Sequence, residues 1–293
     1  MTNILITGAT GQLGGAIARH LAKRIPVSRI AALARDPAKA GDLTALSIDV
    51  RKGDYADAES LIAAFSGIDT LVFISTVAFS DAITQHRNVV ASAKAAGIRH
   101  VYYTGIQRHD GSGFAISQVT DWERETERLV AESGMSVTLL RNAMYLDALP
   151  FMLGDVLLKG RIEAPAGQAR AALAVRDELA EAIAILVADA GHEGRTYTLG
   201  GSEAVSMAEI AEILSASSGR RIDYDDIAVA DYVAARSAQG LPDFVAAFLA
   251  EWFVAIGAGE FAEVTGDLEA ILGRKPLTAA HFLLAQFAGT MAG

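Results

Sequence analysis

Residues 3–14 read Asn3-Ile4-Leu5-Ile6-Thr7-Gly8-Ala9-Thr10-Gly11-Gln12-Leu13-Gly14, and this stretch decides the fold. A short β-branched run, then glycines, then a helical pattern that continues to about Lys23 predicts a strand, a tight turn and a helix. A second apolar run over residues 30–34 follows the helix and closes a βαβ unit.

The three glycines of the turn have the spacing Gly-x-x-Gly-x-x-Gly. Gly8 and Gly11 allow the backbone to turn sharply and approach a pyrophosphate, and Gly14 allows the helix to pack on the strand. The helix N-terminus offers N–H groups and the positive end of a dipole to the phosphates. The alternative is a turn that uses glycine for its conformation alone, but the strand before it and the helix after it favour a dinucleotide site.

Arg35 ends the second predicted strand, with Lys39 one helical turn further on. An acidic residue at this position would accept hydrogen bonds from a free ribose 2′-hydroxyl, whereas an arginine binds a 2′-phosphate. The sequence therefore predicts NADPH rather than NADH. The alternative is a solvated arginine paired with its neighbour Asp36.

Composition and charge restrict the class of protein. The 293 residues are 52% hydrophobic and 20% charged, with 27 glycines, no cysteine and a formal net charge of −10. An acidic chain without a basic run is a poor nucleic-acid binder, and the lack of cysteine excludes disulfides and thiolate metal sites. A strand that begins at residue 3 leaves no room for a signal peptide, and no apolar stretch has the length of a bilayer span. We expect a cytoplasmic protein with no nucleic-acid or membrane partner, and a homodimer is left open.

Further apolar runs alternate with helical patterns along the chain, at 46–50, 70–75, 100–105, 136–140 and 196–199. This alternation predicts an α/β fold, a Rossmann-type doubly wound parallel sheet. After residue 142 the pattern becomes irregular and then mostly helical. We expect an NADP-binding domain over residues 1–142, to which 176–200 return, and a smaller, mostly helical substrate-capping domain over 143–293.

Small polar residues end two neighbouring strands at the edge where such sheets bind ligands. Ser75 and Thr76 follow one strand, and their hydroxyls can bond the ribose next to nicotinamide. Thr104 and Gly105 end the next strand. We expect all four residues to lie beside the cofactor.

The loop after the third strand contains Asp54 and Tyr55. In a doubly wound sheet this loop lies beside the adenine pocket, so both residues could contact the base. Asp54 could equally serve the turn before a helix that begins near Asp57, and the sequence leaves both interpretations open.

The six histidines are His20, His86, His100, His109, His192 and His281, and no pair has the spacing of a zinc site. We therefore predict no metal. His86 is expected at a helix surface or interface. The charged helix predicted over 121–133 is interpreted as mostly a solvated face.

Six short motifs follow one another along the chain. They are Gly8-Ala9-Thr10-Gly11-Gln12-Leu13-Gly14, Ala34-Arg35-Asp36-Pro37-Ala38-Lys39-Ala40, Gln85-His86-Arg87-Asn88-Val89, Ala93-Lys94-Ala95-Ala96-Gly97, Leu140-Arg141-Asn142 with Tyr145, and Gly191-His192-Glu193-Gly194. This ordered set resembles the bacterial NADPH:quinone oxidoreductases and the related triphenylmethane reductases, in the NmrA-like, atypical branch of the short-chain dehydrogenases. The likeness extends from residue 3 to the helical tail.

The resemblance implies a Rossmann-type domain that carries NADPH and a helical second domain, with the substrate between them. By position, the pyrophosphate is expected at Gly8, Thr10, Gly11, Gln12, Leu13 and Gly14, and the 2′-phosphate at Arg35. Ser75, Thr76, Thr104 and Gly105 would line the nicotinamide half, and Asn142 and Tyr145 would face the substrate. Glu123 departs from the pattern, because relatives carry His or Lys there, and this puts a proton-donor role at that position in doubt.

The chain lacks the Tyr-x-x-x-Lys pair with which ordinary short-chain dehydrogenases protonate an alkoxide. A quinone needs less help, because its reduced oxyanion has a pKa of about 10, near that of tyrosine. We therefore expect direct hydride transfer from NADPH to a quinone-like or other electrophilic conjugated acceptor, with Asn142 and Tyr145 positioning the acceptor. Their alternative roles are a strand-end cap and a core tyrosine.

A non-catalytic function is the competing prediction. NmrA-like proteins also include regulators that bind the dinucleotide and report redox state to a protein partner. Nucleotide-sugar epimerisation is a weaker alternative, because it needs the tyrosine base that the chain lacks.

Overall fold

A computed structural model describes residues 3–76, 81–109, 111–117 and 119–288. The chain forms two compact units. The first contains Met1–Ile106, Gln118–Asn142 and Asp177–Thr198, and the second contains Gln107–Ser117, Ala143–Arg176 and Leu199–Gly293. Among the described helices, none combines the length and the apolar character needed to cross a bilayer.

The first unit is built on a seven-stranded sheet with the order β3-β2-β1-β4-β5-β6-β9. Its strands are β1 (Ile4–Ile6), β2 (Ile30–Ala34), β3 (Asp49–Lys52), β4 (Thr70–Ile74), β5 (His100–Ile106), β6 (Ser136–Asn142) and β9 (Thr196–Leu199). The paired strands are parallel, and β9 continues this direction beside β6. The order reverses between β1 and β4, which is the switch point of a doubly wound sheet. The α/β fold expected from the sequence is confirmed.

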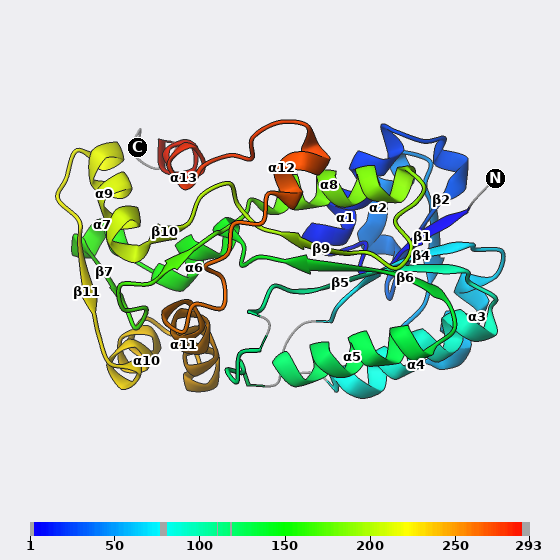
Figure 1. The fold of residues 1–293 in the computed structure, drawn as a ribbon, viewed down its shortest axis with the longest axis horizontal. Coiled ribbons are helices and arrows are strands. Elements are labelled where there is room, and N and C mark those ends of the chain that lie inside the picture. The colour runs from blue at the N-terminus through cyan, green and yellow to red at the C-terminus, as the bar shows by residue number, and fades with distance from the viewer. Residues whose placement is uncertain (1–2, 77–80, 110, 118, 289–293) are drawn as a thin grey trace. The chain divides into compact units, whose positions relative to one another are not determined.

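Helices cover both faces of this sheet (Figure 1). One face carries α1 (Gln12–Ala22), α2 (Gly41–Ala45) and α8 (Arg176–Ala188), and the other carries α3 (Ala58–Phe65), α4 (Ala82–Ala95) and α5 (Thr120–Glu132). Short 3₁₀ turns, η1 (Val27–Arg29) and η2 (Pro37–Ala40), flank β2. Capping sets where two helices begin, because Asp57 accepts from the Ser60 amide and Asp81 accepts from the Thr84 amide.

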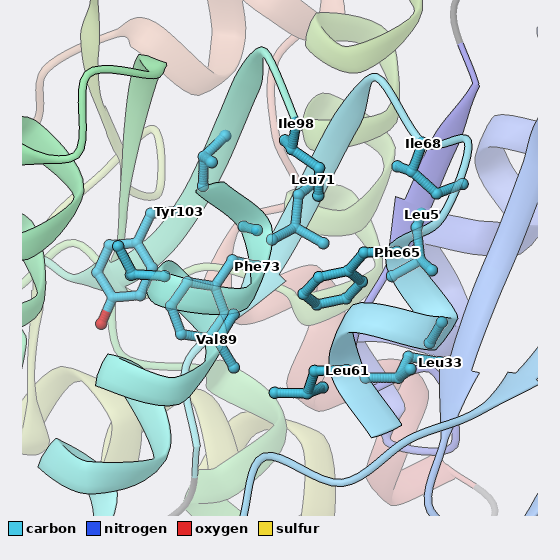
Figure 2. Close-up of a cluster of buried hydrophobic side chains, with 14 of the residues drawn as sticks. Leu5, Leu33, Leu61, Phe65, Ile68, Leu71, Phe73, Val89, Ile98 and Tyr103 are labelled. Atoms are coloured by element: carbon cyan, nitrogen blue, oxygen red, sulfur yellow. The ribbon is translucent and has the colours of Figure 1, made fainter. Parts of the chain in front are cut away.

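A hydrophobic cluster fills the space under α3, α4 and α5 (Figure 2). Leu5, Phe65, Phe73, Val89 and Tyr103 are all fully buried in it. At one end of the cluster, Figure 2 shows the Tyr103 hydroxyl pointing away from Phe73. Tyr103 thus joins the core to polar groups beyond it.

The third strand lies later in the chain than expected. The sequence predicts a strand over 46–50, but Leu46 and Ser47 close α2, and Ser47 adopts a left-handed backbone with φ of 63°. The strand that forms, Asp49–Lys52, is mostly charged. Charged residues are tolerated in β3 because it is an edge strand and borders solvent.

The second unit is mostly helical. It contains η3 (Leu146–Ala148), α6 (Leu149–Leu153), α7 (Val156–Lys159), α9 (Met207–Ser218), α10 (Val229–Ala238), α11 (Asp243–Gly257), α12 (Asp267–Leu272) and α13 (Ala279–Ala288). A capping box of Ser206 and Glu209 begins α9.

Short strands in the second unit were not expected from the sequence. They are β7 (Arg161–Ala164) paired parallel with β11 (Asp223–Asp226), and β8 (Arg170–Ala171) paired antiparallel with β10 (Val205–Ser206). An acidic run such as Asp223–Asp226 has low strand propensity. Contacts distant in sequence offset this, since Arg161 pairs with Asp225 at 2.9 Å and the Tyr224 hydroxyl donates to the Ala164 carbonyl.

Candidate functional site

The turn after β1 has the conformation that a phosphate cradle needs. Gly8 has φ of 59°, and the Gly11 amide donates to the Gly8 carbonyl at 2.9 Å. Helix α1 then begins at Gln12, and Gly11 at its N-cap brings no side-chain cap. The turn residues Gly8, Thr10, Gly11 and Gln12 are exposed. The start of an eleven-residue helix that has no side-chain cap favours an anion.

Gly14 is buried where the helix meets the turn. A Cβ atom at this position would lie 2.5 Å from the Gly8 carbonyl oxygen, closer than real contacts allow. Leu13 is also buried, and its side chain belongs to the core under the cradle. The spacing of the glycines is therefore required by packing as well as by the turn, and the cradle fits a dinucleotide pyrophosphate.

Arg35 follows β2 directly and is exposed. Asp36 does not pair with it, because the Asp36 carboxylate accepts from the Ala38 amide at 3.2 Å and caps the η2 turn. Within the described ranges, no hydrogen bond or ion pair engages Arg35. A guanidinium at this strand end is thus available to an anionic ligand.

The side chains of Tyr55 and Asp54, which the sequence placed beside the adenine pocket, both make hydrogen bonds within the protein. The Tyr55 hydroxyl lies 2.5 Å from Thr7 Oγ1 and 2.9 Å from the Ile74 carbonyl, so it joins the ends of β1 and β4. Burial raises the pKa of Tyr55 well above its usual value. Asp54 accepts from the Ala56 amide at 3.0 Å, which favours the turn interpretation of that residue.

The ends of β4 and β5 bring the predicted hydroxyl residues together. Ile74 and Thr104 are register partners, and the Ser75 amide donates to Thr104 Oγ1 at 3.2 Å. Thr104 is buried, whereas Ser75 and Thr76 are half-buried. The two strand ends therefore form one polar edge.

His86 is hydrogen-bonded to the backbone just after the end of β4. The sequence predicts it at a helix surface or interface, but the side chain is fully buried. Its Nε2 accepts from the Thr76 amide at 3.0 Å. Its Nδ1 lies 2.7 Å from Thr126 Oγ1, which already donates to the Trp122 carbonyl. The Nδ1 atom must therefore carry the proton, and burial lowers the pKa of this neutral histidine to about 4.

Glu123 lies where the sequence did not place it. It was expected on the solvated face of its helix, yet it is buried under the polar edge. Its Oε1 accepts from Ser75 Oγ at 2.6 Å and from Trp122 Nε1 at 3.3 Å, and its Oε2 accepts from the Tyr103 hydroxyl at 2.6 Å. Burial raises the pKa of Glu123 to about 7 and that of Tyr103 well above its usual value.

Gly105 makes room for this carboxyl group. A Cβ atom at residue 105 would lie 2.8 Å from Glu123 Oε2. Gly105 was predicted as a cofactor contact, and its place in the fold adds a second reason for glycine.

Asn142 ends β6, opposite Ile106 of β5. The side chain is buried, and its Oδ1 atom has no hydrogen-bond partner in the described part of the chain. A buried acceptor of this kind costs free energy unless a ligand or water satisfies it. The first unit therefore presents an acceptor at its sheet edge that suits an N–H or O–H donor.

Tyr145 lies three residues after Asn142, in a segment of the second unit, and is half-buried. The Arg176 guanidinium stacks over its ring at 4.8 Å. Tyr145 also forms a bridge with Ala174. The ring is therefore fixed by its own unit.

Among the described residues, no three histidine, aspartate or glutamate side chains are placed to hold a metal ion. The groups that the site offers are amides, hydroxyls, one arginine and a buried carboxyl.

The fold and the glycine turn define an α/β protein that binds a dinucleotide at the carboxyl edge of a parallel sheet. The chain belongs to the NmrA-like family, whose pattern it matches over residues 1–279. This confirms the family resemblance found in the sequence.

Three comparisons make the likeness specific. Quinone oxidoreductase 2 of Escherichia coli is 37% identical over 278 residues, which span 95% of this chain and 96% of that protein. The crystal structure of the E. coli NADPH-dependent quinone oxidoreductase QOR2 with NADPH has a TM-score of 0.92 and covers 97% of this chain and 99% of that one. Triphenylmethane reductase of Citrobacter sp. in complex with NADP(H) has a TM-score of 0.89 at 32% identity, covering 97% of this chain and 99% of that one.

Proposed function

We propose that this protein is an NADPH-dependent oxidoreductase that transfers hydride directly to a quinone-like acceptor. The observation that carries the proposal is the exposed glycine cradle after β1 in a chain so similar, over nearly its whole length, to a quinone oxidoreductase solved with NADPH. Bound NADPH supplies the hydride, and the protein supplies orientation and a site from which water is excluded.

The residues proposed to hold the cofactor lie in the first unit. The cradle residues Gly8, Thr10, Gly11, Gln12, Leu13 and Gly14 would surround the pyrophosphate. Arg35 would bind the 2′-phosphate, since it is exposed and its neighbour Asp36 is engaged in capping. Ser75, Thr76, Thr104 and Gly105 would line the nicotinamide half, and Tyr55 would support the cradle from below through Thr7.

A quinone-like acceptor is inferred from the missing Tyr-x-x-x-Lys pair and from the presence of Asn142 and Tyr145. No Tyr-x-x-x-Lys pair is present to protonate a strongly basic alkoxide, so a ketone is poorly served. The product of quinone reduction is a phenolate with a pKa of about 10, which is more easily protonated. Asn142 and Tyr145 are proposed to orient the acceptor, Asn142 through its amide and Tyr145 through its ring or hydroxyl.

The test is NADPH consumption by the purified protein, with no flavin added. Benzoquinones, naphthoquinones and a triphenylmethane dye serve as acceptors, and the spontaneous reaction is subtracted. Saturable turnover that is faster with NADPH than with NADH is expected. Tight cofactor binding without turnover on any acceptor would contradict the reductase and favour a dinucleotide-binding regulator.

We further propose that the protein is cytoplasmic and that it assembles as a homodimer. The absence of cysteine suits a reducing compartment. Sedimentation of the purified protein would decide between monomer and dimer.

A further inference from the structure

The Glu123 carboxyl group is buried at the polar edge without a cation to balance it. In the part of the chain that the structure describes, no lysine or arginine pairs with Glu123, whereas Glu127 one turn later pairs with Arg141 at 3.0 Å. A carboxylate without a cation is costly to bury, and such groups take up a proton instead. Glu123 is therefore a place where the protein can hold a proton.

The hydrogen bonds around Glu123 show where that proton can go. Ser75, Trp122 and Tyr103 all donate to the carboxylate form. In the acid form Glu123 must itself donate, and of its neighbours only the hydroxyls of Ser75 and Tyr103 can accept. Tyr103 is fully buried, while Ser75 is half-buried at the end of β4. The outward path therefore runs through Ser75.

We propose that Glu123 and Ser75 form a proton relay that protonates the reduced acceptor. This inference rests on the proposed quinone reduction. After hydride transfer, Ser75 Oγ gives its proton to the acceptor's oxyanion, so that one O–H bond forms there and one breaks at Ser75. Ser75 Oγ takes the proton from Glu123 Oε1 in the same step. Glu123 is left as a carboxylate that Tyr103 and Trp122 hold, and water returns its proton.

The surroundings of Glu123 suit a relay that works near neutral pH. With its pKa raised to about 7 by burial, both protonation states are populated there, which is the condition for efficient acid catalysis. The groups that face it do not compete. Tyr103 stays protonated because burial raises its pKa well above 10, and His86 stays neutral because burial lowers its pKa to about 4. Glu127, on the same helix, adds a small further rise.

The relay predicts a difference between two kinds of acceptor. A quinone needs a proton after hydride transfer, whereas the cationic carbon of a triphenylmethane dye needs none. The ratio of quinone turnover to dye turnover therefore isolates the proton step. Glu123→Gln and Ser75→Ala should each lower this ratio about tenfold or more at pH 7, given the usual size of acid catalysis. Glu125→Gln, on the same helix, is the matched control, since the Glu125 carboxylate pairs with Arg87 and Arg128 and makes no contact with Ser75, and it should leave the ratio unchanged.

Infrared spectroscopy of the protein without cofactor supplies a readout independent of activity. A protonated carboxyl band should be present at pH 6, disappear by pH 8, and be absent from Glu123→Gln at both values. Ser75→Ala should keep the band while losing the quinone-to-dye ratio, which shows that the proton is stored but not delivered. The quinone rate of the wild type should fall above about pH 7, and this fall should be missing in Glu123→Gln.

Each contrary result has a distinct meaning. If no carboxyl titrates near neutral pH, or if both variants keep the wild-type ratio, the relay is wrong although the reductase stands. If the wild type reduces neither quinone nor dye, the reductase is wrong and the relay falls with it.

Discussion

Glu123 makes the stability of the protein depend on pH. Its pKa rises from an ordinary 4.5 to about 7 in the fold, so between these values the folded protein keeps a proton that the unfolded chain releases. Stability therefore falls as the pH rises through this range, by up to about 3 kcal/mol at 1.36 kcal/mol per pKa unit. Glu123→Gln cannot titrate, so we expect it to gain that amount relative to the wild type between pH 4.5 and 7, as measured by urea unfolding.

The comparison must be made at each pH because His86 acts in the opposite direction. Burial lowers its pKa from 6.5 to about 4, so its contribution to stability is lost as the pH falls through that range. This contribution is the same in the wild type and in Glu123→Gln and cancels between them. Glu125→Gln is the control, since hydrogen bonds from Arg128 and Arg87 hold the pKa of Glu125 at about 2, below the range tested. A difference between Glu123→Gln and wild type that does not change with pH would contradict the raised pKa.

Glu123 also shows what the sequence could and could not predict at this scale. Its spacing from Thr126 and Val130, both buried, places it on the inward stripe of α5. That signal was present, but five further charged residues from 121 to 128 indicated a solvated face. The partners that hold the Glu123 carboxyl inside the fold are the hydroxyls of Ser75 and Tyr103. These residues belong to distant parts of the chain, so the pattern of α5 alone does not reveal them. By contrast, the conformation of the glycine turn and the position of Arg35 at the end of β2 were predictable, because they depend on neighbours in the chain.

At the scale of elements, the junction of β1 and α1 depends on Gly14. We expect Gly14→Ala to destabilise the protein by about 1–3 kcal/mol and to weaken NADPH binding, because the added Cβ meets the Gly8 carbonyl and displaces the turn. Gly41→Ala is the matched control. Gly41 has a helical φ of −59° and nothing within 4 Å of a Cβ, so this change should stabilise by about 0.4–1 kcal/mol.

Urea unfolding and a fluorescence titration with NADPH measure the two effects of these variants. If Gly14→Ala bound NADPH and unfolded like Gly41→Ala, the close packing of helix on turn would have no part in the cradle.

The elements themselves were predictable to different degrees. The inner strands β1, β2 and β4 are apolar and almost wholly buried, so their composition alone predicts them. The β7 and β11 pair was missed because its partners lie 64 residues apart, as in the ion pair of Arg161 with Asp225, and an acidic strand has no local signature. The expected third strand was displaced because Leu46 and Ser47 close helix α2.

At the scale of the whole molecule, the negative net charge of the protein opposes the binding of NADPH. The chain carries a formal net charge of −10, and NADPH is a polyanion. The long-range field therefore repels the cofactor, and binding depends on local groups, namely the start of α1 and Arg35. Reversing one of these local charges should have a far larger effect than reversing a distant one.

Thermal unfolding with and without cofactor tests this. NADPH at one hundred times its Kd should stabilise the folded protein by about 2.7 kcal/mol and raise Tm by roughly 5–10 °C for a chain of this size. At the same concentration NADH should raise Tm less, because Arg35 has no 2′-phosphate to bind.

Arg35→Asp should weaken NADPH binding about ten- to hundredfold and remove its advantage over NADH. Lys275→Asp, which reverses an exposed charge of the second unit, should keep the wild-type shifts. If Arg35→Asp kept the preference for NADPH, another group would read the 2′-phosphate, and the end of β2 would not select the cofactor.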